Sequence, residues 1–282
     1  MQRYDSIFKP GLFDGQVVIV TGGGSGIGRC VALELAELGA TLVLVGRKID
    51  KLETVAKEIT DLGGSVSYHA CDIRDEEGVI AVVRAVLEQH GRIDGLFNNA
   101  GGQFLAPLRD MKLKGFETVV RSNLTGGFIF MREVYVQWME QHGGSIVNMA
   151  GDVGGGWPYV AHSGAARAGM INLTQSAAAE WARSGVRVNA IAPGIIDTSG
   201  HWSYSPEEKA VNTGGHRCLM QRLGSVSETS SAIVFLLSQG AAFMTGTTVH
   251  VDGGAPYVRG LGDLGPKGRF PVYDGLHERT PR

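Results

Sequence analysis

Short apolar runs alternate along the chain with longer segments in which apolar residues recur every three or four positions. The short runs predict buried strands, and the helical spacing of the longer segments predicts helices. Strands are expected at residues 16–20, 41–45, 66–70, 93–97, 145–149, 186–191 and 247–251. Helices are expected at residues 29–36, 50–62, 76–90, 116–139, 163–184 and 227–237, with a short piece at 206–211. This alternation predicts an α/β fold with one seven-stranded parallel sheet and helices on both faces.

Nothing resembling a linker divides the 282 residues, and a chain of this length can bury a large core in one domain. We therefore expect a single domain over residues 1–282. The irregular stretch 198–224 is rich in Gly, Ser, His, Trp and Tyr, which predicts a functional, substrate-binding loop. Residues 253–282 form a Gly- and Pro-rich tail whose contacts the sequence does not indicate.

Composition narrows the classes of partner. The 26 Lys and Arg against 28 Asp and Glu give a formal charge of −2, which argues against nucleic acid and favours a small-molecule substrate. Cys30, Cys71 and Cys218 have neither metal-ligand nor disulfide spacing, so we expect no metal site and a reducing compartment, the cytoplasm. No signal peptide, membrane span or peroxisomal address is apparent, which agrees with that location.

The first predicted strand runs directly into the stretch TGGGSGIG at residues 21–28, and a helix follows. Gly22, Gly26 and Gly28 lack the side chains that would block a tight turn, approach of a phosphate, and packing of helix on strand. Backbone N–H groups at the helix start suit an anion, so we expect a dinucleotide pyrophosphate here, in a Rossmann-type doubly wound domain. The residues expected to hold it are Gly22, Ser25, Gly26, Ile27 and Gly28.

The second predicted strand ends in Arg47 and Lys48. An acidic residue at this place would accept hydrogen bonds from the ribose of NAD, whereas two cations suit the 2′-phosphate of NADP. We therefore expect NADP(H), the alternative being two exposed surface cations without a cofactor role. Asp72 and Ile73 follow the third strand, at the edge where open α/β sheets bind ligands.

The motifs TGxxxGIG, NNAG (residues 98–101) and NAIAPGII (residues 189–196) resemble those of the short-chain dehydrogenases. The resemblance implies that Asp72 contacts the adenine ring and that the NNAG turn lines the cofactor and braces the sheet. It implies a water-holding role near the catalytic centre for Asn123, which a satisfied core amide would also explain. It further implies a homo-oligomer, a tetramer or dimer. The cofactor residues added by the resemblance are Ile73, Asn99, Ala100, Gly101, Pro193, Gly194 and Ile196.

The family's catalytic YxxxK motif is changed in this chain. The matching text HSGAARAGM, residues 162–170, places Ser163 at the tyrosine and Arg167 at the lysine, and Ala150 and Gly151 occupy the upstream serine region. A serine hydroxyl is a poorer proton donor than a phenol, although it can hydrogen-bond an oxyanion. Arg167 can still neutralise the cofactor or hold its ribose as the lysine does.

Four stretches resemble the trans-2-enoyl-CoA reductase branch of the family, namely NNAGGQFLAP (98–107), SNLTGG (122–127), GGSIVN (143–148) and HSGAARAG (162–169). Similar bacterial relatives are assigned to citronellol or citronellal oxidation. The resemblance implies an NADP(H)-dependent oxidoreductase that reduces an enoyl- or oxo-acyl thioester or a related hydrophobic carbonyl compound. The alternatives are an alcohol or aldehyde dehydrogenase of a terpenoid-like substrate, and a cofactor-binding protein without turnover.

Reduction of an enoyl thioester needs a hydrogen-bond donor for the developing enolate and a proton for the α-carbon. We expect Ser163 to be the donor, with His162, Asp152 or Tyr159 as the proton source. A structural role is an equal alternative for His162 and the preferred one for Asp152 and Tyr159. The aromatic residues expected near an apolar substrate are Trp157, His201, Trp202 and Tyr204.

Overall fold

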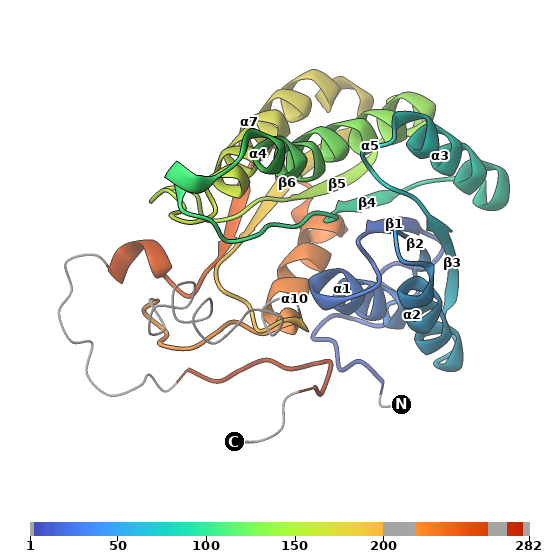
Figure 1. The fold of residues 1–282 in the computed structure, drawn as a ribbon. Coiled ribbons are helices and arrows are strands. Elements are labelled where there is room, and N and C mark those ends of the chain that lie inside the picture. The colour runs from blue at the N-terminus through green and yellow to red at the C-terminus, as the bar shows by residue number, and fades with distance from the viewer. Residues whose placement is uncertain (1–2, 200–217, 259–269, 279–282) are drawn as a thin grey trace.

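The computed structural model describes residues 3–199, 218–258 and 270–278, and the description below concerns these parts of the chain. They form one seven-stranded sheet in the order β3-β2-β1-β4-β5-β6-β7, and all six neighbouring pairs are parallel (Figure 1). The strands are β1 (Val17–Thr21), β2 (Thr41–Gly46), β3 (Ser65–Ala70), β4 (Gly95–Asn98), β5 (Gly144–Met149), β6 (Val186–Pro193) and β7 (Thr248–Val251). The predicted fold class is confirmed, with strand bounds within two residues of those expected.

Helices cover both faces of the sheet. Figure 1 shows α1, α2 and α10 below the sheet and α3, α4, α5 and α7 above it. The α-helices are α1 (Gly26–Glu37), α2 (Ile49–Asp61), α3 (Glu76–His90), α4 (Leu113–Val120), α5 (Gly126–Val134), α6 (Glu140–His142), α7 (Ala161–Trp181) and α10 (Val226–Leu237). Short 3-10 turns lie at Leu108–Asp110, Ala182–Ser184, Gln239–Ala241 and Ala255–Val258. The helical piece expected at 206–211 lies outside the described residues.

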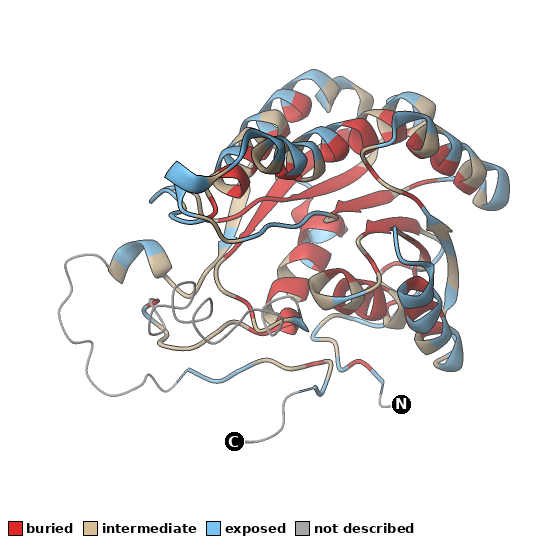
Figure 2. Cartoon of the chain, in the orientation of Figure 1, coloured by how far each residue is buried: buried red, intermediate tan, exposed pale blue. Residues whose placement is uncertain are grey.

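The core lies on both faces of the sheet, which is why the central strands, such as β1 and β2, are continuous apolar runs rather than alternating ones. Successive residues of a strand point to opposite faces. Val18 and Val20 accordingly belong to the core between the sheet and helices α1 and α10. Val17 and Ile19 belong to the core between the sheet and helices α3 and α5. Figure 2 shows this burial along the sheet, with exposed residues on the outer sides of the helices.

The long helix predicted over residues 116–139 is present, with two differences from the prediction. The helical segment begins at Leu113, and two π-helical turns, Arg121–Thr125 and Tyr135–Met139, interrupt it. The Ser122 hydroxyl donates to the carbonyls of Thr118 and Val119, and such bonds compete with the regular helical pattern. Asn123 lies inside the first wide turn, and π-helical turns are frequent at functional sites.

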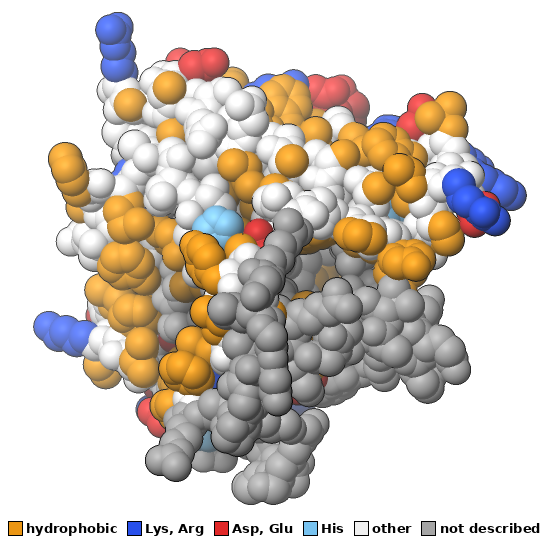
Figure 3. Space-filling model, turned by 90° about the vertical axis from the view of Figure 1, so that its left-hand side faces the viewer, with side chains coloured by type: hydrophobic (Ala, Val, Ile, Leu, Met, Phe, Trp, Pro, Cys, Tyr) orange, Lys and Arg blue, Asp and Glu red, His pale blue; other side chains and the backbone are white. Residues whose placement is uncertain are grey.

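Since all the strands are parallel, their carboxyl ends share one edge of the sheet, and the segments that carry the predicted site residues leave from that edge. Figure 3 views the molecule from the left-hand side of Figure 1, and hydrophobic side chains are prominent on this face. Among the helices of the described residues, none has both the length and the apolar character to cross a lipid bilayer.

Candidate functional site

The glycine-rich turn joins β1 to α1. Gly22 and Gly26 have φ angles of 68° and 54°, in the left-handed region that favours glycine. A Cβ added to Gly28 would lie 2.3 Å from the Gly22 carbonyl oxygen, so the turn closes tightly on the helix. Ser25 precedes the helix in an extended conformation, its side chain exposed and not used as a cap, and the first turn of α1 has no acidic residue. Its N–H groups and positive dipole end therefore suit a pyrophosphate.

The neighbouring strand end braces this turn. The Thr21 hydroxyl accepts hydrogen bonds from the backbone N–H groups of Asn99 and Ala100, each at 2.9 Å. The Asn99 side chain donates in turn to the Thr21 carbonyl at 2.9 Å. These bonds join the end of β1 to the segment after β4, as expected for a turn that braces the sheet. They also place Asn99 and Ala100 beside the glycine turn.

Arg47 and Lys48 are exposed after the end of β2. Asp72, after β3, binds Arg74 with both carboxylate oxygens, at 2.9 Å and 2.5 Å for the two shortest bonds. The hydrogen bonds from Arg74 lower the pKa of Asp72 to about 2, and the nearby charge of Arg47 acts in the same direction. Three cationic side chains thus lie at the ends of β2 and β3. Arg74 was missed by sequence reasoning, although it is only two residues from Asp72.

Ile73 and the residues after β6 have packing roles. Ile73 is buried, and a Cβ on Gly126 would lie 2.8 Å from its side chain, so it packs against the start of α5. Pro193 ends β6, and the Gly194 N–H donates to the Val251 carbonyl at 3.0 Å. Ile196 is buried and forms a bridge with Gly224. This turn therefore connects the central sheet to the irregular segment 198–224, of which only residues 198, 199 and 218–224 are described.

The residues that replace the usual catalytic motif come together. The Asn123 Nδ2 donates to the Ser163 hydroxyl oxygen at 3.1 Å, and the Asn123 Oδ1 accepts from the Gly102 N–H at 2.8 Å. Asn123 and Ser163 are 2% and 1% exposed. Because the backbone N–H can only donate, the bond to Gly102 fixes which end of the amide faces Ser163.

Arg167 lies one helical turn after Ser163. Its Nη1 donates to the Met149 carbonyl, and a Cβ on Gly101 would lie 2.8 Å from its Nη2. Burial lowers its guanidinium pKa to about 10, so Arg167 remains charged at neutral pH. No carboxylate of the described residues forms an ion pair with it. An arginine held in protein surroundings without a counter-ion is suited to an anionic ligand.

The three candidate proton sources lie in different surroundings. His162 is 0% exposed and packs edge-on against the Phe104 ring, with centroids 4.5 Å apart. Its Nδ1 accepts the Ser163 N–H at 2.7 Å, and its Nε2 forms no hydrogen bond within the described chain. Burial lowers the pKa of His162, although the carbonyls of Val160 and Phe104 oppose this shift. The imidazole is therefore neutral and covered, which disfavours it as a proton source.

Asp152 and Tyr159 are more accessible. Asp152 is half-buried, and its carboxylate lies near His250 and Asp252, with the nearest N and O atoms of the three within 4.8 Å of one another. Tyr159 is 44% exposed and has a φ angle of 67°, which is uncommon for a residue other than glycine. The Ala106 N–H donates to the Tyr159 carbonyl at 2.8 Å and so joins the loops after β4 and β5. The structure thus does not bring His162, Asp152 and Tyr159 into one hydrogen-bonded group.

Comparisons with known proteins agree with this geometry. Residues 22–256 match the family described as Enoyl-(Acyl carrier protein) reductase. A peroxisomal 2,4-dienoyl-CoA reductase of Danio rerio is 36% identical over 258 residues, which cover 90% of this chain and 86% of that protein. A probable 2,4-dienoyl-CoA reductase of Bacillus subtilis (strain 168) is 35% identical over 243 residues, which cover 85% of this chain and 96% of that one.

A solved structure is more similar still. The citronellol catabolism dehydrogenase of Pseudomonas aeruginosa PAO1 is 57% identical, with a TM-score of 0.80, and the match covers 89% of this chain and 99% of that chain. The sheet order, the glycine turn and these matches lead to one conclusion. The chain belongs to the short-chain dehydrogenase/reductase family of oxidoreductases, enzymes that use a nicotinamide cofactor.

Proposed function

We propose that this protein is an NADP(H)-dependent reductase of an enoyl- or oxo-acyl thioester or a related hydrophobic carbonyl compound. The observation that carries the proposal is the hydrogen bond from Asn123 to Ser163. The Ser163 oxygen acts as acceptor in that bond, so its own proton is available to a substrate oxygen. An available hydroxyl beside a fixed amide is suited to stabilise an oxyanion.

Each residue of the site has a separate role in the proposed reaction. When bound, the nicotinamide cofactor supplies the hydride. Ser163 donates a hydrogen bond to the thioester oxygen as negative charge develops there, and Arg167 holds the cofactor and keeps positive charge nearby. The α-carbon is protonated afterwards by a group that reaches solvent, for which Asp152 and Tyr159 are suited by their exposure. His162 then orients the start of α7 through its bond to Ser163.

The proposal of NADP(H) rests on the exposed cations Arg47 and Lys48 at the end of β2 and on Arg74 nearby. No acidic residue occupies the end of β2 itself. The 2′-phosphate would bind these cations, while the glycine turn would hold the pyrophosphate.

An apolar substrate is supported by exposed aromatic and aliphatic side chains on the segments that follow β4, β5 and β7. These residues are Phe104, Leu108, Tyr159 and Tyr257, between 39% and 72% exposed. Trp157 is partly buried against Gly151 and Gly164 and donates to the Asp152 carbonyl. His201, Trp202 and Tyr204 lie outside the described residues.

The expectations for the whole protein remain part of this proposal. They are a single domain over residues 1–282, a substrate-binding role for residues 198–224, and a cytoplasmic homo-oligomer, tetramer or dimer. The three cysteines are buried and unpaired, which suits a reducing compartment. Exposed hydrophobic side chains on the helical layers, Phe128, Val136 and Phe235, would be covered in an oligomer.

A second candidate function is oxidation or reduction of a terpenoid-like alcohol or aldehyde. It is favoured by the 57% identity to the citronellol catabolism dehydrogenase. The test is NADPH oxidation with a panel of enoyl thioesters, oxo-acyl thioesters and citronellal, together with NADP reduction by citronellol. Turnover confined to thioesters supports the first proposal, and turnover confined to the terpenoids supports the second. A protein that binds NADPH but turns over no member of the panel would instead be a cofactor-binding protein.

A further inference from the structure

Residues 270–278 lie against the start of α10, although the two segments are far apart in the sequence. Arg222 is the centre of this contact. Its Nη1 and Nη2 donate to the two carboxylate oxygens of Glu228 at 2.9 and 2.6 Å, and its Nη2 also donates to the Pro271 carbonyl at 3.0 Å. The Arg222 and Glu228 side chains are 21% and 20% exposed, so this bidentate pair is largely sheltered from solvent.

The cap of α10 binds the same segment. Ser225 and Glu228 form a capping box, in which each side chain binds the other residue's backbone N–H. The Ser225 hydroxyl also donates to the Tyr273 carbonyl at 2.6 Å, and the Tyr273 N–H lies 3.4 Å from the Glu228 carboxylate. The sequence SVSE at residues 225–228 carries the signal of this cap, but nothing in it indicates the partner segment.

The other side of Arg222 leads to the turn 193–197. We call it the nicotinamide turn, because the family resemblance implies that it passes the nicotinamide of the cofactor. Gly224 donates to the Ile195 carbonyl at 3.0 Å and accepts from the Asp197 N–H at 2.8 Å. Ile195 follows Pro193 and Gly194 directly. Two residues of the turn 193–197, Ile195 and Asp197, are therefore hydrogen-bonded to Gly224, which lies two residues from Arg222.

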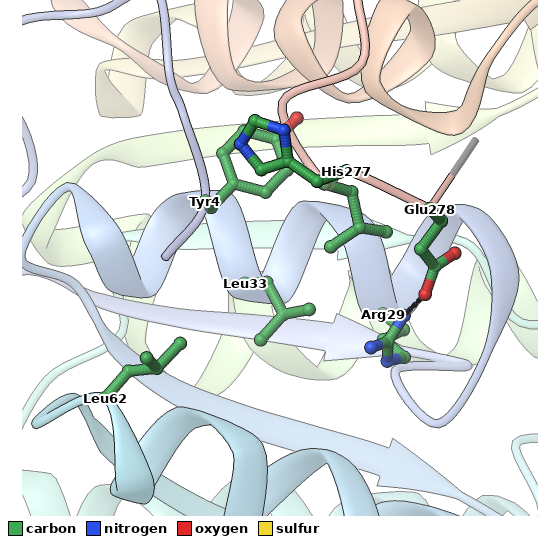
Figure 4. A pocket seen from close by; sticks show the side chains of 7 residues that line it. Tyr4, Arg29, Leu33, Leu62, His277 and Glu278 are labelled. Carbon is green, nitrogen blue, oxygen red and sulfur yellow. Dashed lines mark hydrogen bonds and ion pairs between the residues drawn. The ribbon is translucent and has the colours of Figure 1, made fainter. Parts of the chain in front are cut away.

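A second attachment holds the end of the segment. Glu278 forms an ion pair with Arg29 of α1, one residue after Gly28 (Figure 4). Tyr273 also donates to the Asp5 carbonyl at 2.7 Å. A cavity of about 200 Å³ lies between α1 and this segment.

We propose that residues 270–278 act through Arg222 to position the turn 193–197 and, with it, the nicotinamide end of the cofactor site. Arg222 is a positioning residue, because it contacts the tail and the cap of α10. The segment itself lies beyond residue 256, where the family match ends, whereas Arg222 and Glu228 lie within the matched range. The inference rests on the proposed cofactor site but not on the identity of the substrate.

The alternative is that the segment only stabilises the folded protein. The two roles predict different binding behaviour. A loosened nicotinamide turn weakens ligands that reach it and spares ligands confined to the glycine turn and the β2 end. A loss of global stability alone leaves the ratio of the two affinities unchanged in the folded protein.

The test uses Arg222→Ala and Arg222→Lys in the full chain, with Arg92→Ala as the matched control. Arg92 also forms two hydrogen bonds with one carboxylate, that of Asp94. Both residues precede β4, so they lie at the amino ends of the parallel strands, opposite the proposed cofactor site. The probes are NADPH and adenosine 2′,5′-bisphosphate, which lacks the nicotinamide. If the parent protein binds NADH instead of NADPH, the pair becomes NADH and ADP.

We expect Arg222→Ala to weaken NADPH binding by about tenfold, since small displacements of a binding group have effects of this order or larger, and to leave the bisphosphate unchanged. Arg222→Lys keeps the charge but lacks the planar fork, so a smaller loss in the same direction is expected. Faster amide hydrogen exchange in residues 193–197 should accompany both changes. Equal affinity ratios in all variants would overturn the proposal, whether or not the melting temperature falls. Failure of the parent protein to bind either dinucleotide would instead overturn the proposed function.

Discussion

The Asn123 side chain donates to the Ser163 hydroxyl oxygen across 3.1 Å, from a π-helical turn to the first turn of α7. The Gly102 N–H holds the other end of the same amide. The hydroxyl is thus oriented before any substrate arrives. Preorganised donors of this kind act without reorganisation at the moment of reaction, which is the main source of their effect.

Ser163→Ala is expected to lower kcat by about 10²-fold or more, because it removes one oxyanion donor, and to leave the Kd for NADPH nearly unchanged. Steady-state rates on the best substrate of the panel and fluorescence titration with NADPH measure the two quantities. Ser176→Ala, an exposed position of the same helix, is the control and should have parent activity. Full activity of Ser163→Ala on every substrate would show that the serine is only a spacer.

Arg47→Asp is expected to reverse the cofactor preference. The parent protein should bind NADPH at least about tenfold more tightly than NADH, which corresponds to about 1.4 kcal/mol for a charge-assisted phosphate contact. The variant should prefer NADH, since a carboxylate repels the phosphate and accepts bonds from the ribose. Lys57→Asp, on an exposed part of α2, controls for the change of net charge. Equal binding of NADPH and NADH by the parent protein would contradict this assignment.

Arg167→Ala is expected to weaken NADPH binding and to lower kcat together, unlike Ser163→Ala, because its charge is assigned to the cofactor. Arg167→Lys should retain part of the NADPH affinity and part of kcat, since a lysine keeps the positive charge but lacks the planar guanidinium that can donate two parallel hydrogen bonds. Arg183→Ala, exposed after the same helix, serves as the control. The same two titrations measure the outcome. If Arg167→Ala lost turnover with unchanged cofactor affinity, the charge would belong to the substrate.

Glu34 offers a test of the pH dependence of stability. It is fully buried, accepts hydrogen bonds from Ser6 and Ser230, and has a pKa raised by burial. The folded state therefore binds its proton more tightly than the unfolded state, and stability falls as pH rises from about 4.5 through the raised pKa.

Glu34→Gln should remove this fall. We expect its melting temperature relative to the parent to increase between pH 4.5 and pH 8, as measured by thermal unfolding across that range. Glu88→Gln, at an exposed position of α3, should show no such trend. A difference between Glu34→Gln and the parent that is constant with pH would mean that Glu34 keeps the same proton affinity in both states.

The predictable parts of this protein are those in which neighbouring residues determine the structure. The alternation of apolar runs and the glycines at 22, 26 and 28 predicted the parallel sheet and the tight turn between β1 and α1. The π-helical turn around Asn123 was not predictable from periodicity, because the same residues fit a regular helix. The bond from Arg222 to Pro271 was not predictable either, since it joins positions 49 residues apart. The burial of His162 likewise depends on Phe104, from another loop.

The bond between the Ser163 N–H and the His162 Nδ1 also has a spectroscopic consequence. A backbone N–H can only donate, so the proton of the neutral ring must reside on Nε2. Among the protein's eight histidines, His162 should therefore show one fixed tautomer and slow exchange of its ring proton in nitrogen NMR spectra. Because it adjoins Ser163, its resonances would serve as a native probe for ligands that enter the site.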